Sequence, residues 1–184
     1  MFAEPIKLLH LHYKMTYKIR IIGDPVLHKS TEDVTEFDKD LAGVVSGMVN
    51  TMTESNGVGL SAPQVGVSKK IFIFNSSIEV NKDLLMSFIN PEIIETEGVC
   101  EFEEGCLSIP GIFEYVARPE KIWVKYFDID GNEHEKHLDG LSARIFQHER
   151  DHLSGILFID RLSSDKRNQL SQTLCSLKKE WRNH

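Results

Sequence analysis

The sequence lacks long hydrophobic runs and has few cysteines, and each shortage excludes a class of protein. Its apolar runs are short pieces such as IFIF and GILFI, far below the roughly 20 residues of a membrane-spanning helix, so we expect no membrane association. The 3 cysteines among 184 residues are an odd number and do not suit a disulfide framework, which favours a reducing, cytoplasmic location. Residues 1–16 lack the apolar stretch and cleavage site of a secretory signal, and we interpret them as a loosely ordered N-terminal extension.

The chain is also short of positive charge, with 21 lysines and arginines against 28 aspartates and glutamates. A net charge of −7 argues against a surface that grips nucleic acid throughout, and we expect no DNA partner. Residues 163–184 are an exception, because they hold five basic and two acidic residues. Contact of this segment with ribosomal RNA would explain the surplus, and so would a solvated helix whose basic end is stabilised by the helix dipole. Both interpretations stay open.

The spacing of apolar residues predicts one α+β domain, without internal repeats, linkers or low-complexity tracts. The expected elements, in chain order, are a strand at 17–22, a helix from Leu41 with one buried stripe, a strand at 69–75 buried on both faces, two extended pieces within 84–98 separated at Pro91, a hairpin around Asp130-Gly131, a helix from about Leu141 with Gly155 after its end, and a terminal helix. This order predicts antiparallel or mixed β-sheets wrapped around a central helix. We assign residues 17–162 to the main body and 163–184 to a C-terminal helix of the same domain.

The stretch QHERDHLSGILF contains the pattern H-E-x-x-H. On a helix His148 and His152 lie one above the other on the same face, where two imidazoles can bind one metal ion. Glu149 lies beside them and can reach the water of such an ion without ligating it. Apolar residues flank the motif on both sides, which predicts a buried helix. A buried helix with three polar groups needs a reason for them, and a metal supplies one.

A catalytic metal site needs a third protein ligand and an open position. The third histidine of one protease class would fall at position 158, and the residue there is Phe158. Asp160 and Asp165 are possible carboxylate ligands, but Asp160 is close in sequence and Asp165 belongs to the next helix's first turn. Cys106 is the better candidate, because the adjacent Gly105 marks a tight loop that fixes the direction of a side chain.

Three segments together resemble the peptide deformylase family. They are GVGLSAPQ at 57–64, EGCLS at 104–108 and HERDH at 148–152, in the family's order and with its spacing. The resemblance covers about Tyr17 to Leu162. Ser61 stands where the family usually has alanine; we expect it to be tolerated, with a partner for its hydroxyl if it is buried.

The resemblance implies a metal-dependent hydrolase that removes the N-terminal formyl group from formyl-methionine of newly made polypeptides. It assigns Cys106, His148 and His152 as metal ligands and Glu149 as the catalytic acid and base. Gln64, through its side-chain amide, and Leu107, through its backbone N–H, would stabilise the oxyanion. The metal would be one divalent ion per chain, Fe(II) in the cell, with zinc, nickel or cobalt possible in purified protein. The partners would be nascent formyl-methionyl peptides.

The substrate would bind along the same three segments. An apolar pocket for methionine and a place for the peptide backbone are expected from Val58, Gly59, Phe102, Glu104, Gly105, Leu141 and Ile145. Ordinary core packing would explain each apolar member of this set taken singly. We also expect Glu104 to form an ion pair with Arg118 that stiffens the metal loop.

Two rival functions stay open from the sequence. A metalloprotease that cuts within chains would need an open cleft and would accept unformylated peptides. A catalytically silent homologue would bind metal or formylated chains without turnover, against which the presence of Glu149 and Gln64 argues. Asp151 also has two interpretations: it orients a ligand histidine, or it forms a salt bridge on the helix surface.

Overall fold

The computed structural model describes residues 15–75 and 85–182. The predicted N-terminal extension therefore lies outside the described residues, apart from its last two positions. Within the described ranges, no helix combines the length and the hydrophobicity required to cross a membrane. The described residues form three α-helices and two antiparallel β-sheets, in agreement with the predicted α+β class.

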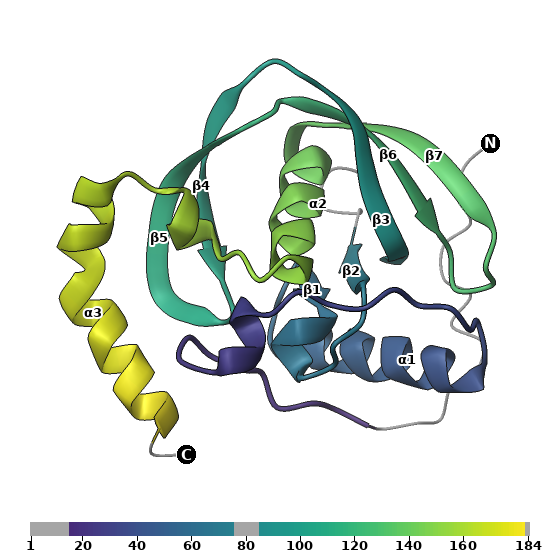
Figure 1. Ribbon diagram of the computed structural model, residues 1–184, viewed down its shortest axis with the longest axis horizontal. Coiled ribbons are helices and arrows are strands. Elements are labelled where there is room, and N and C mark those ends of the chain that lie inside the picture. Colours follow the sequence, from purple (N-terminus) through teal and green to yellow (C-terminus); the bar gives the residue numbers. More distant parts are fainter. Residues whose placement is uncertain (1–14, 76–84, 183–184) are drawn as a thin grey trace.

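The larger sheet has five strands in the order β1-β2-β3-β6-β7, and the smaller is the hairpin β4-β5. The strands are β1 (Gly59–Ser61), β2 (Ile71–Asn75), β3 (Leu85–Glu97), β4 (Cys100–Cys106), β5 (Ile109–Arg118), β6 (Lys121–Phe127) and β7 (Glu133–Asp139). The helices are α1 (Lys39–Glu54), α2 (Gly140–Leu153) and α3 (Ser164–Arg182), with short 3-10 helices η1 (Pro25–His28), η2 (Ala62–Val65) and η4 (Phe158–Arg161). Helix α2 lies at the centre, between the β4-β5 hairpin and the larger sheet (Figure 1).

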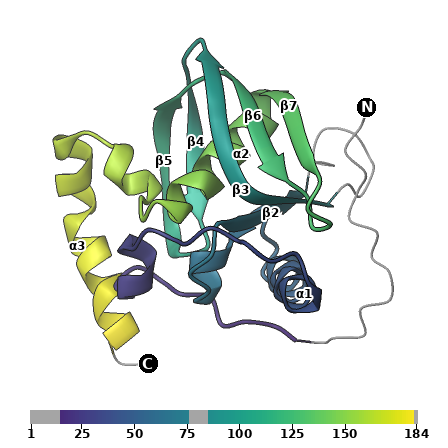
Figure 2. The same ribbon diagram turned by 45° about the vertical axis from the view of Figure 1, so that its right-hand side comes forward.

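Strand β2 separates two hydrophobic cores, which confirms that both of its faces are buried. Ile71 and Ile73 pack with helix α1 in one cluster, whereas Phe72 and Phe74 point to the other face and pack with α2. The rings of Phe72 and Phe146 meet edge to face with centroids 5.0 Å apart. Alternation along a strand thus attaches α1 and α2 to opposite faces of the same sheet. Figure 2 shows α1 on its side of β2, across from α2.

Helix α2 ends in a hydrogen-bonded glycine cap. Gly155 has a φ of 71°, and its N–H donates to the carbonyl of His152 at 3.1 Å. The N–H of Ile156 donates to the carbonyl of Asp151 at 3.0 Å. This pair of bonds satisfies carbonyls that the helix leaves free and fixes the position of its last turn, which carries His152.

The predicted strand at 17–22 is wrong. Its N–H groups donate to three different parts of the chain: Tyr17 to Thr51 Oγ1 at 2.8 Å, Arg20 to the carbonyl of Gln64 at 2.7 Å and Ile22 to that of Ser108 at 2.8 Å. Among the described residues no single strand runs beside this segment, so no β-ladder forms.

The predicted break at Pro91 is also wrong, because β3 continues through it as one strand of 13 residues. Pro91 lies in a register shift between Ile89 and Glu92 against β6, where its missing N–H costs no ladder bond. Asn90, with a φ of 48°, supports this bulge by bonding both backbone groups of Val34 at 2.8 Å.

The predicted C-terminal helix is confirmed as α3, and it lies outside the β4-β5 hairpin (Figure 1). Leu174 and Leu177 pack in one cluster with Ile22, Leu27 and residues of the hairpin. The helix is therefore attached through one apolar stripe, while its other faces are exposed.

Candidate metal and active site

Strand β4 and helix α2 bring three potential metal ligands together. Donor atoms of Cys106, His148 and His152 lie within 4.8 Å of one another, and no other group of this kind occurs in the part of the chain that the structure describes. His152 Nε2 is 3.3 Å from Cys106 Sγ. Tetrahedral coordination with bonds of about 2.0 to 2.3 Å needs ligand atoms roughly 3.5 Å apart, so the spacing suits one ion.

Glu104 fixes the orientation of His148. The Nδ1 of His148 lies 2.9 Å from Glu104 Oε2, so the ring donates through Nδ1 and leaves the lone pair of Nε2 for a metal. Arg118 donates to both oxygens of Glu104, at 2.6 and 2.9 Å, which confirms the predicted ion pair. Burial opposes ionisation of Glu104, but these bonds from Arg118 and His148 outweigh it and hold its pKa well below the usual range.

The ion pair belongs to a larger network of charged side chains, all buried except Arg161. Arg118 also donates to Asp151 at 2.7 Å, and Arg161 donates to both oxygens of the same carboxylate. Arg144 donates to Glu104 at 3.0 Å and to the carbonyl of Val116 at 2.9 Å. Asp151 is thus buried and holds Arg118, rather than contacting a ligand histidine or pairing on an exposed surface.

Arg144 and Arg161 were not predicted from the sequence. Arg144 carried a usable signal, because it precedes His148 by one helical turn and so lies on the face that carries both histidines. Arg161 carried none, since η4 is brought to Asp151 only by the path of the chain after α2.

The two histidines have opposite pKa shifts. Burial favours the neutral form of both rings. For His152 the charge of the neighbouring His148 also disfavours protonation, so the pKa of His152 falls well below 6.5. For His148 the hydrogen bonds with Cys106 and Glu104 outweigh burial and raise the pKa to about 10. His152 is thus held neutral, the form in which an imidazole binds a metal ion. The residues present fit a metal site.

Glu149 is buried beside this cluster but is not one of the three donors. Burial raises its pKa, against the opposing effects of His148 and of a hydrogen bond from Ser61. Gly59 makes room for it, because a Cβ there would lie 2.6 Å from Glu149 Oε1. A buried carboxyl with a raised pKa is suited to taking up and returning a proton.

The side chain of Gln64 has one defined orientation. Its Oε1 accepts from the N–H of Ser61 at 2.8 Å, while its Nε2 donates to Ser108 Oγ at 3.1 Å and lies 3.4 Å from Cys106 Sγ. Gln64 is buried on η2 rather than exposed on a loop. Its amide nitrogen therefore lies beside the sulfur of Cys106, one of the three potential metal ligands.

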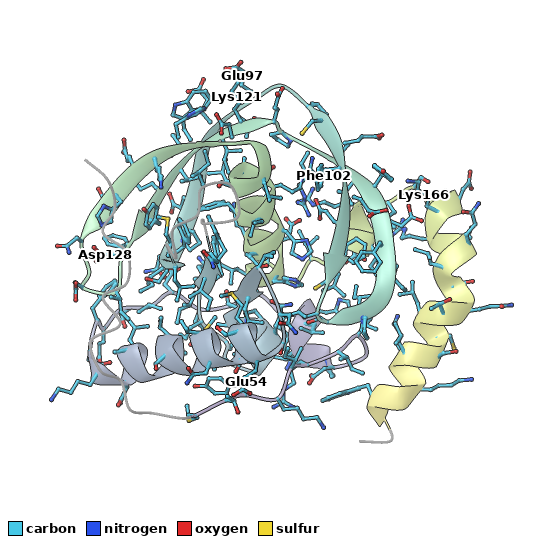
Figure 3. All side chains as sticks on the ribbon, turned by 180° about the vertical axis from the view of Figure 1, so that it is seen from behind. Glu54, Glu97, Phe102, Lys121, Asp128 and Lys166 are labelled. Carbon is cyan, nitrogen blue, oxygen red and sulfur yellow. The ribbon has the colours of Figure 1, made fainter. Side chains whose placement is uncertain are left out.

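A cavity of about 470 Å³ opens onto these groups. It is lined by every predicted site residue except His152, namely Val58, Gly59, Gln64, Phe102, Glu104, Gly105, Cys106, Leu107, Leu141, Ile145, His148 and Glu149. Val58 and Phe102 are 50% and 53% exposed, which excludes ordinary core packing for these two. Figure 3 labels Phe102 on the hairpin beside α2.

A sequence profile described as polypeptide deformylase matches residues 16–168. The chain belongs to the polypeptide deformylase family. The peptide deformylase of Thermotoga maritima is 45% identical over 165 residues, which cover 88% of this chain and 96% of that protein. The solved peptide deformylase of Plasmodium falciparum superposes with a TM-score of 0.85; it is 43% identical, and the match covers 90% of this chain and 98% of that one. The solved peptide deformylase of Thermus thermophilus superposes with a TM-score of 0.83; it is 40% identical, and the match covers 90% of this chain and 99% of that one.

Membership in the deformylase family confirms the activity that the three motifs predicted. The chain is an enzyme, a metal-dependent hydrolase that removes the N-terminal formyl group of newly made polypeptides. The solved deformylases also share its arrangement of helices and antiparallel sheets, so the predicted fold class is confirmed.

Proposed function

We propose that Cys106, His148 and His152 hold one divalent ion on the floor of the cavity and that deformylation occurs there. When bound, the ion supplies a Lewis acid that polarises the formyl carbonyl and lowers the pKa of water. The observation that carries the proposal is the convergence of a thiol, two imidazoles and a buried carboxylate on one cavity. Fe(II) is the metal we propose for the cell; imidazole and thiolate ligands also suit zinc, nickel and cobalt.

Glu149 performs the proton transfers in this proposal. It takes a proton from the attacking water as the water oxygen bonds to the formyl carbon. It then gives that proton to the peptide nitrogen as the C–N bond breaks, so that formate and a free N-terminal amine leave. Its buried position keeps bulk water from competing for the proton.

Gln64 and Leu107 stabilise the negative charge on the formyl oxygen. The Gln64 amide is held by bonds to Ser61 and Ser108, so it is oriented before the substrate arrives. Leu107 lies in the turn that follows the ligand Cys106, and it lines the cavity. Donors that need no rearrangement during the reaction give the largest stabilisation of the transition state.

The methionine side chain of the substrate occupies the apolar part of the cavity. Leu141 and Ile145, on the first turns of α2, form its inner wall, and the exposed Val58 and Phe102 form its mouth. The peptide backbone extends past Gly59 and Gly105, which both line the cavity.

Substrate choice distinguishes a deformylase from its two rivals. Protein purified without oxygen and supplied with Fe(II) is expected to release one formate per formyl-Met-Ala-Ser molecule and to leave Met-Ala-Ser intact. Chelation should abolish the release, and added Fe(II), nickel or cobalt should restore it. Formate assay with mass spectrometry of the peptides measures both results. Cleavage of internal bonds would favour a protease, and binding without formate release would favour a silent homologue.

We further propose that the enzyme acts in the cytoplasm, at the ribosome, through basic residues of α3. Arg167, Lys178 and Lys179 are exposed on this helix. Replacing all three by alanine is expected to reduce co-sedimentation with ribosomes several-fold at low salt. Formate release from a short peptide should stay unchanged, because α3 does not line the cavity. Equal co-sedimentation of both proteins would favour the solvated-helix interpretation.

A further inference from the structure

Ser61 has a fully buried hydroxyl at a position where the family resemblance predicts alanine. The hydroxyl oxygen lies 2.9 Å from the backbone carbonyl of Glu149 and in short hydrogen-bond contact with Glu149 Oε2. Resting on the proposed role of Glu149, we propose that Ser61 is a positioning residue that fixes the Glu149 carboxylate in its reactive orientation. Ser61 acts through Glu149 and does not line the cavity.

Both oxygens of the carboxylate meet strand β1. Oε2 bonds Ser61, and Oε1 packs against Gly59, where a Cβ would come within 2.6 Å. Residues two apart on a strand face the same side, and Leu60 between them points into the other core. The terminal torsion of a glutamate is otherwise broad. Contacts to both oxygens restrict this torsion of Glu149 to one orientation, with one edge of the carboxylate facing the cavity.

The hydroxyl can be removed without disturbing the second catalytic group. Gln64 is held by the backbone N–H of Ser61, and that bond is independent of the side chain. Ser61→Ala therefore deletes one oxygen atom from the contact with Glu149 while keeping the contact with Gln64. The change is small, and alanine fits a buried strand position.

The expected effect of Ser61→Ala is a decrease of kcat by about tenfold with KM within twofold of wild type. This is the lower part of the range for a lost hydrogen bond to a charged group. The backbone around Glu149 stays in place, so misplacement of the carboxylate is partial. Metal content should not change, because Ser61 contacts none of the three donors.

The experiment compares Ser61→Ala with Thr51→Val, which removes another buried hydroxyl, bonded to the carbonyl of Gly47 at 2.8 Å on helix α1. Steady-state deformylation gives kcat and KM, elemental analysis gives metal content, and crystal structures of wild type and Ser61→Ala give the position of the Glu149 carboxylate. We expect a second carboxylate orientation and lower kcat in Ser61→Ala alone. Thr51→Val should lose some thermal stability and keep kcat.

The inference is overturned if the Glu149 carboxylate keeps its wild-type position in Ser61→Ala, or if kcat is unchanged. A decrease shared by Thr51→Val, or one explained by loss of metal, would also overturn it by showing a merely structural role. Failure of the proposed function looks different, because wild type itself would then release no formate. In that case the crystal structures still decide whether Ser61 positions the carboxylate.

Discussion

Glu149→Gln is expected to lower kcat by about 10³-fold to 10⁴-fold while the metal content stays at the wild-type level. Glutamine keeps the shape of the side chain but cannot accept the proton of the attacking water, and general acid–base groups contribute up to about 10⁴-fold. The metal should stay because the donor cluster consists of Cys106, His148 and His152, without Glu149. Formate release with a formylated peptide, together with elemental analysis of the same sample, measures both quantities.

Glu101→Gln is the matched control for this variant. Glu101 lies on β4, near the metal loop in sequence, but its side chain is exposed and it does not line the cavity. The same loss of one carboxylate should leave kcat unchanged there. If Glu149→Gln kept more than about a tenth of wild-type kcat, the proton transfers would have to be assigned to another group.

The central part of this site was readable from the sequence because it is local. His148, Glu149 and His152 occupy one helix, and helical periodicity alone puts the two histidines on one face with Glu149 beside them. The tight loop made Cys106 the preferred candidate, but only the family resemblance assigned it as a ligand, since no rule of local structure says that β4 ends beside α2. The strand at 69–75 was readable for a similar reason: its unbroken apolar run implies burial on both faces.

The segments that were misread depend on partners far along the chain. Residues 17–22 have the composition of a strand, but their N–H groups reach α1, η2 and the turn after β4, and no strand within the described residues pairs with them. At Pro91 the bulge is held by Asn90 and Val34, which are 56 residues apart. Contacts between residues far apart in the sequence determine the structure of both segments, and the intrinsic β-propensity of a segment carries no information on such contacts.

The charge network could be read only in part. The pairing of Glu104 with Arg118 was predicted, but three arginines share two carboxylates, and Arg144 and Arg161 arrive from separate elements. Buried ions are stable only when several opposite charges and hydrogen bonds meet, so the network has to be understood as a unit. Asp151 is linked to His148, a proposed metal ligand, through Arg118 and Glu104.

Arg118→Met is expected to destabilise the protein by about 3–5 kcal/mol, because it leaves Glu104 and Asp151 buried with fewer partners. It should also weaken metal binding by roughly 10- to 100-fold, since Glu104 would no longer hold the His148 ring in one orientation. Urea denaturation and competition with a chelator measure the two effects. Lys69→Met is the control: it breaks an exposed pair with Glu32, and neither quantity should change.

Acid unfolding gives a separate test of the same network. Burial raises the pKa of Glu104, but its bonds with Arg118 and His148 outweigh this and lower it overall. A lowered folded-state pKa contributes stability above the unfolded value of about 4.3, which is lost as pH falls through the folded-state value. In Arg118→Met this lowering is reduced, so the variant should unfold at a higher pH than wild type. Coincident acid transitions and equal metal affinity would show that Arg118 does not support the site.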